Sequence, residues 1–119
     1  MPDRSYVGID RNRHNEWEVV LWDGDRIWSR VFKNTWAELG ELVLFIAGHG
    51  RRPRICLNPT SPAALKLIKS VGGIPDAEVL LLSAEGMRLH RPWLRGDARL
   101  PGGGEARALF LARCAERII

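Results

Sequence analysis

The chain has 119 residues, enough for one domain with a hydrophobic core. Apolar residues make up 45% of it, and no apolar run reaches the roughly 18 residues of a membrane-spanning helix. The net charge is +4 and most cations are arginine, which suits planar recognition of phosphate. Two cysteines in apolar contexts and no apolar leader predict a cytoplasmic protein with reduced thiols and no membrane partner.

The first third of the chain predicts an antiparallel meander of three strands. Residues 5–10 (SYVGID), 17–23 (WEVVLWD) and 26–32 (RIWSRVF) have the apolar content or alternation of strands. The DGD at 23–25 is a hairpin signal.

Helices and buried strands are expected to alternate after the meander. Thr35 and Glu38 stand at capping-box spacing at the start of the first predicted helix, and its apolar face is marked by Trp36, Leu39, Val43 and Ile46. The predicted elements are a helix over 34–50, a strand over 54–58, a helix over 61–73, a strand over 77–83 and a helix over 104–119. Residues 84–103 are arginine-rich and are expected to form an irregular segment of the same domain.

The predicted order βββαβαβα favours a mixed five-stranded sheet with helices on both faces, as in the RNase H-like fold. If the first and fourth strands lie side by side, Asp10 and Asn58 both lie at carboxyl ends near the centre of the sheet. A carboxylate there suits a metal ligand. The alternatives for Asp10 are a cap on the turn DRNR or an ion pair with Arg11 or Arg13.

Arginine clusters predict a polyanion partner, with a solvated basic surface as the alternative. The predicted phosphate contacts are Arg13, Arg51, Arg52, Arg88, Arg91, Arg95 and Arg99. Trp17 is expected in the core, because it faces away from Glu16 and Glu18. Trp22 and Trp28 are expected on exposed faces suited to base stacking or a protein interface, unless a helix or the C-terminal tail covers them.

Five stretches follow one another in a familiar order: YVGID, VVLWDGDRI, VFKNTWAEL, RICLNPTSPAALKLI and AEVLLLSAEGMRLHR. Together they resemble the N-terminal, RuvC-like catalytic domain of the DEDD insertion-sequence transposases, over roughly residues 5–117. The most specific stretch is Phe32–Thr35. The resemblance implies a nuclease that uses Mg²⁺ or Mn²⁺ on DNA or RNA. The family's C-terminal domain, which carries a serine motif, has no match among these residues.

The family places four acids in its metal site, and this chain keeps only part of that set. Asp10 matches the first acid, Asn58 replaces the second, Gly102 stands at the third position and Glu105 at the fourth. The basic residue of the first motif is Arg13. By this resemblance the metal and catalytic residues are Asp10 and Glu105, with Asn58 as a neutral oxygen donor. The pattern favours a degenerate nuclease that binds nucleic acid.

The sequence is also compatible with three other functions. The chain could be a protein-interaction module on the same fold, or a weak Mg²⁺-dependent nuclease or resolvase completed by a partner chain in a homo-oligomer. A fragment of an actin-like ATPase fits poorly, because DRNR lacks the glycine and hydroxyl that a phosphate loop needs after Asp10.

Overall fold

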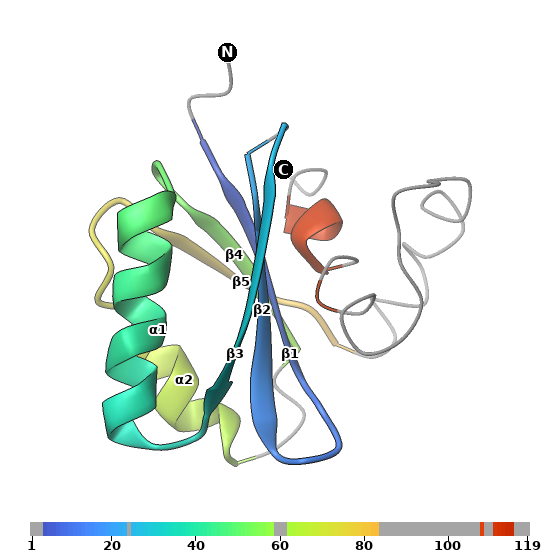
Figure 1. Ribbon diagram of the computed structural model, residues 1–119, viewed down its shortest axis with the longest axis vertical. Helices are drawn as coiled ribbons and strands as arrows, with labels where there is room; N and C mark the ends of the chain where they lie inside the picture. Colours follow the sequence, from blue (N-terminus) through green and yellow to red (C-terminus); the bar gives the residue numbers. More distant parts are fainter. Residues whose placement is uncertain (1–3, 24, 59–61, 84–107, 109–110, 116–119) are drawn as a thin grey trace.

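The computed structural model describes residues 4–23, 25–58, 62–83, 108 and 111–115 (Figure 1). The elements are β1 (Tyr6–Arg11), β2 (Glu16–Trp22), β3 (Ile27–Lys33), α1 (Trp36–His49), β4 (Arg54–Leu57), α2 (Ala64–Val71) and β5 (Glu78–Leu81). They form a five-stranded sheet in the order β3-β2-β1-β4-β5. The β1–β2 and β2–β3 pairs are antiparallel, while β1–β4 and β4–β5 are parallel. The prediction of a mixed five-stranded α/β sheet is confirmed.

Side-chain hydrogen bonds close both hairpins of the meander. Between β1 and β2, Asn12 Oδ1 accepts the backbone N–H groups of His14 and Glu16, at 2.8 and 3.0 Å. Between β2 and β3, Asp23 Oδ1 accepts those of Asp25 and Arg26, at 2.9 and 2.8 Å. These backbone donors lower the pKa of the Asp23 carboxyl, since they stabilise its charged form. The predicted hairpin at 23–25 is confirmed.

Helix α1 begins where the local sequence predicts it. Thr35 is the N-cap, and its Oγ1 accepts the backbone N–H of Glu38 at 3.2 Å. The Glu38 carboxylate accepts the backbone N–H of Lys33 at 3.0 Å. In a regular capping box it would instead accept the backbone N–H of the N-cap residue, Thr35. The buried face consists of Leu39, Leu42, Phe45 and Ile46. The prediction that Trp36 belongs to this face is wrong: it lies at the first helical position and is 58% exposed.

Helix α2 is shorter than its predicted range of 61–73. It runs over Ala64–Val71, with Ala63 as an N-cap that makes no side-chain hydrogen bond. Pro62 therefore lies before the helix, where its carbonyl accepts the backbone N–H of Leu65 at 3.1 Å. The predicted cap, Ser61, lies outside the described residues.

Both faces of the sheet are covered. On one face, α1 and α2 pack on a core that includes Val7, Ile9, Ile55 and Leu57. On the other lie the helical residues 108 and 111–115, which pack on Val20, Cys56 and Leu82 (Figure 1). Helices on both faces are thereby confirmed, while the remainder of the predicted helix 104–119 lies outside the described residues.

Gly8 allows the second face to pack closely. A Cβ at Gly8 would lie 1.8 Å from the carbonyl oxygen of Ala108 and 2.4 Å from the backbone nitrogen of Ala112. The helix backbone therefore rests directly on β1, which only a residue without a side chain permits.

The three tryptophans of the meander are buried or half-buried. Trp17 is 2% exposed, as predicted, and its indole N–H donates to Asn34 Oδ1 at 3.0 Å. Trp22 is 4% exposed, and the Arg113 guanidinium lies 4.3 Å from its ring centre. Of the two expectations for Trp22, exposure or coverage by the C-terminal helix, the structure shows coverage. Trp28 is half-buried and packs against the α1 side of the core.

Cys56 and Cys114 belong to one buried cluster on the second face, and both are free thiols. Burial raises the pKa of each to about 12. The prediction of core thiols is confirmed. Among the described residues, no helix has the length and apolar character needed to cross a membrane.

Candidate functional site

Asp10 and Asn58 lie next to each other at the carboxyl ends of the two central parallel strands. In the β1–β4 pair, Ile9 is opposite Leu57, and the next residue on each strand is Asp10 and Asn58. Each is 7% exposed. The juxtaposition predicted from the strand order is confirmed, at the end of the sheet where open α/β folds hold ligands.

Strand alternation assigns Asp10 to the face covered by the C-terminal helix. Val7 and Ile9 contribute to the α1–α2 core, whereas Gly8 meets Ala108 and Ala112 on the opposite face. Asp10 is two residues beyond Gly8, so its side chain leaves β1 on that second face. Cys56 belongs to the second face too, and Asn58 follows it at the same spacing.

The sequence reasoning missed Glu18 as a member of this site. In the β1–β2 pair, Asp10 is directly opposite Glu18, which is half-buried. Side chains directly opposite one another in an antiparallel pair leave the sheet on one face, with Cβ atoms about 5 Å apart. The sequence does contain a signal for this pairing, because the short loop between β1 and β2 sets the register of the two strands. The site therefore offers two carboxylates and one amide.

This set of donors limits what the site can hold. Across the described ranges, no group of three or more His, Cys, Asp or Glu side chains is placed to hold a metal ion. Asp10 and Glu18 together offset the charge of one divalent cation. Two-metal cleavage needs further carboxylates, because two ions about 4 Å apart repel each other strongly. The described residues therefore do not fit a two-metal centre, and Glu105, Arg88, Arg91, Arg95 and Arg99 lie outside them.

The remaining predicted arginines occupy opposite ends of the sheet. Arg13 is exposed in the β1–β2 loop, at the same end as Asp10. Arg51 and Arg52 are exposed at the other end, where the backbone N–H of Ser5 donates to the Arg51 carbonyl at 2.8 Å. The length of β1 separates the two ends by about 17 Å. The structure therefore does not gather these three arginines into one cluster.

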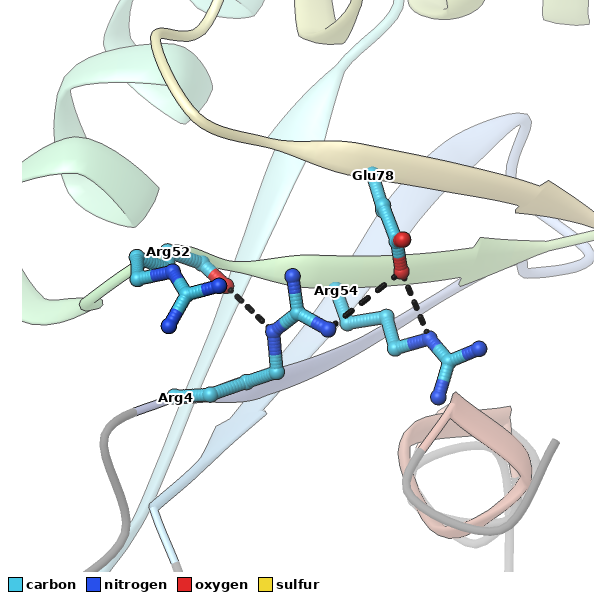
Figure 2. A network of polar contacts seen from close by, with 4 residues as sticks. All are labelled: Arg4, Arg52, Arg54 and Glu78. Atoms are coloured by element: carbon cyan, nitrogen blue, oxygen red, sulfur yellow. Dashed lines mark hydrogen bonds and ion pairs between the residues drawn. The ribbon is translucent and has the colours of Figure 1, made fainter. Parts of the chain in front are cut away.

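Two further arginines at that far end form ion pairs with Glu78 (Figure 2). Glu78 Oε2 lies 2.9 Å from Arg54 Nε and 3.4 Å from an Arg4 guanidinium nitrogen. Arg4 Nε also donates to the Arg52 carbonyl at 3.1 Å. This network ties β1 to the ends of β4 and β5. One carboxylate cannot offset two guanidinium groups, so the network stays positively charged, and the side chains of Arg51 and Arg52 are exposed at the same corner.

No protein-family model matches the chain, and no curated protein is significantly similar to it.

Proposed function

We propose that this chain is an RNase H-like domain of the RuvC type, related to the catalytic domains of transposases, that binds DNA or RNA. The strand order β3-β2-β1-β4-β5 with helices on both faces supports this fold. The observation that carries the functional proposal is the adjacent, buried pair Asp10 and Asn58 at the carboxyl ends of β1 and β4. The cytoplasmic location expected from the sequence is part of the same proposal.

Phosphate contacts by arginine supply the binding. Arg13 is exposed at the end of the sheet that carries Asp10, while Arg51 and Arg52 offer a second basic surface. A net charge of +4 attracts a polyanion from a distance. Arginine–phosphate contacts release counterions, so binding of this kind weakens steeply as salt is added.

Cleavage is weak or absent in this proposal. The amide of Asn58 stands where the resembled family has a glutamate, so the site has lost a negative charge that a metal ion needs. Mg²⁺ gives up its water reluctantly and is held weakly by few carboxylates. A partner chain that brings carboxylates to the site would be the route to a working nuclease, and this makes homo-oligomerisation worth measuring.

The test combines binding and cleavage on the same substrates. Fluorescence anisotropy with labelled single-stranded and branched DNA and RNA is followed from about 50 to 200 mM salt, a range in which phosphate contacts lose much of their affinity. We expect a steep loss for the native protein and weaker binding by Arg13→Ala. Asp10→Asn should bind as well as the native protein does.

Cleavage is then assayed with Mg²⁺ and Mn²⁺ on the same oligonucleotides. Absence of cleavage with salt-sensitive binding supports a degenerate site. Cleavage by the native protein that Asp10→Asn abolishes would show a working metal nuclease. Binding that does not depend on salt would remove the nucleic-acid proposal.

A further inference from the structure

Strand β3 is an edge of the sheet, and no described element pairs with its outer side. It spans seven residues, Ile27–Lys33, so a row of backbone N–H and C=O groups faces outward. Such an edge is a template on which another extended segment can add a strand.

A cavity lies between this edge and helix α1. It has a volume of about 350 Å³ and is lined by Arg30, Glu41, Leu44, Phe45 and His49. Arg30 comes from β3, and the other four residues come from α1. A segment added along β3 would therefore run beside this cavity, and alternate side chains of the segment would point into it.

Two aromatic rings, those of Phe45 and His49, line the cavity, and Phe32 packs against Phe45. The ring centres of Phe45 and His49 are 4.9 Å apart, and those of Phe32 and Phe45 are 5.9 Å apart. His49 Nδ1 lies 2.9 Å from the Phe45 carbonyl oxygen, which fixes the imidazole. The Arg30 guanidinium lies 5.2 Å from the centre of the Phe32 ring. Leu44 is 71% exposed at this site, so an apolar side chain can be buried against it.

The other face of β3 also presents apolar side chains. Ile27 and Val31 are 43% and 46% exposed, and by strand alternation they lie opposite to the face of Phe32. The side chains of an added strand that do not enter the cavity would cover these two. One added strand thus buries apolar surface on both faces of the edge.

Charge distinguishes between the segments that could occupy this edge. Strand β3 contains Arg30 and Lys33 and no acidic residue, and Arg26 precedes it. Pairing of β3 with β3 of a second copy would oppose cations to cations, which destabilises a sheet. Acidic side chains opposite Arg30 and Lys33 would form favourable cross-strand pairs. Glu41 also lines the cavity. An apolar side chain therefore suits the cavity itself better than an acidic one does.

We infer that the groove formed by β3 and α1 binds an extended segment of a protein partner, in which two acidic residues three positions apart flank apolar ones. The segment adds a sixth strand beside β3 and places an apolar side chain in the cavity. The segment binds independently of the nucleic-acid site proposed above, since Asp10 lies on β1, two strands from the edge.

The test uses a short synthetic peptide with Glu-Phe-Val-Glu at its centre. In an antiparallel pairing its glutamates can lie opposite Lys33 and Arg30, and its phenylalanine lies on the cavity face. Binding is followed by fluorescence anisotropy, and backbone-amide hydrogen exchange maps where the peptide lies. We expect slower exchange over residues 27–33 and unchanged exchange over β5, the other edge. The same peptide with lysine for glutamate should bind far more weakly, and so should one with a central proline.

Variants of the protein make the test specific to this groove. Arg30→Glu should lower the affinity about fivefold, because it replaces an attractive cross-strand pair with a repulsive one. Leu44→Glu should lower it by a similar factor. Leu65→Glu is the matched control, because Leu65 is 62% exposed on α2 and does not line the cavity.

Several outcomes would overturn the inference. The first is that the acidic peptide does not bind at about 1 mM, which corresponds to a standard free energy near −4 kcal/mol. The second is that the lysine peptide binds equally well. The third is that Arg30→Glu and Leu44→Glu both bind the acidic peptide as the native protein does. Protection of residues 27–33 by self-association of the protein alone would identify a second copy as the occupant. Protection by single-stranded DNA, with no effect of the peptide, would identify a nucleic acid.

Discussion

Asp10 on β1 lies directly opposite Glu18 on β2, so two carboxylates share one face of the sheet beside Asn58. Asp10 is 7% exposed and Glu18 is half-buried. Like charges placed opposite one another destabilise an antiparallel pair. A bound cation, or the loss of one of the two charges, would therefore stabilise this pair of strands.

Removal of one charge should stabilise the protein. We expect Glu18→Gln to raise the free energy of unfolding at pH 7 by about 0.5 kcal/mol, because repulsion with Asp10 is lost. Urea denaturation measures the change. Glu41→Gln, at an exposed position on α1, is the control and should change stability less. A loss of stability in Glu18→Gln would contradict the expected repulsion.

An added carboxylate should have the opposite effect and create a dependence on metal ions. Asn58→Asp places a third acid beside Asp10 and Glu18, and should lower the free energy of unfolding by about 1–3 kcal/mol in EDTA. Mn²⁺ should restore part of this loss, because a ligand that binds the native state stabilises it. Thermal unfolding with EDTA and with Mn²⁺ measures both effects. A melting temperature of Asn58→Asp that does not respond to Mn²⁺ would show that the three side chains do not converge on one ion.

Substitution of Gly8 should disrupt the second face of the sheet. Gly8→Ala puts a methyl group 1.8 Å from the Ala108 carbonyl oxygen, so the C-terminal helix must move away from β1. We expect a loss of about 3 kcal/mol or more in the free energy of unfolding, since overpacking against backbone is poorly relieved. Urea denaturation and near-UV circular dichroism, which reports the packing of Trp22, measure the effect.

The matched control for Gly8 is Gly40 in helix α1, where an added Cβ meets nothing within 4 Å. Gly40→Ala should raise stability by about 0.5–1 kcal/mol, because alanine has the higher helix propensity. Equal effects of the two substitutions would contradict the close approach of helix and strand at Gly8.

The two buried thiols should make stability fall at high pH. Burial, and the proximity of Cys114, raise the pKa of Cys56 from about 9 to about 12, and burial does the same for Cys114. Between these pH values the unfolded chain loses thiol protons that the native state keeps. Because the native state then binds more protons, the free energy of unfolding falls as the pH rises through this window.

Urea denaturation from pH 8 upwards compares the native protein with the Cys56→Ala, Cys114→Ala double variant. The double variant should show a shallower decline above about pH 9. The quantity compared is the slope of the free energy of unfolding against pH, because the loss of packing in the variant changes its stability at every pH. Identical slopes would contradict the raised pKa values.

Local sequence signals predicted the beginning of the chain well. The Thr35 cap, the hairpin at 23–25 and the alternation that buries Trp17 each depend on residues a few positions apart, which interact before any tertiary contact forms. The juxtaposition of Asp10 and Asn58 was also predictable, because the carboxyl ends of neighbouring parallel strands meet at one edge.

Other features were decided by contacts between residues far apart in the sequence. Arg113 lies over the ring of the buried Trp22, and Trp36 is exposed because the core contacts α1 from Leu39 onward. The register of β1 with β2 places Glu18 beside Asp10. The strand directions place Arg51 and Arg52 at the end of the sheet away from Asp10.

The sequence by itself thus determined the elements and their order, since turns, caps and periodicity act over a few residues. Only the tertiary structure decided which side chains meet across strands, which rings the last helix covers, and which edge of the sheet remains open. Those outcomes depend on strand register and helix placement, which close packing of distant segments sets, as the contact of Gly8 with Ala108 and Ala112 shows.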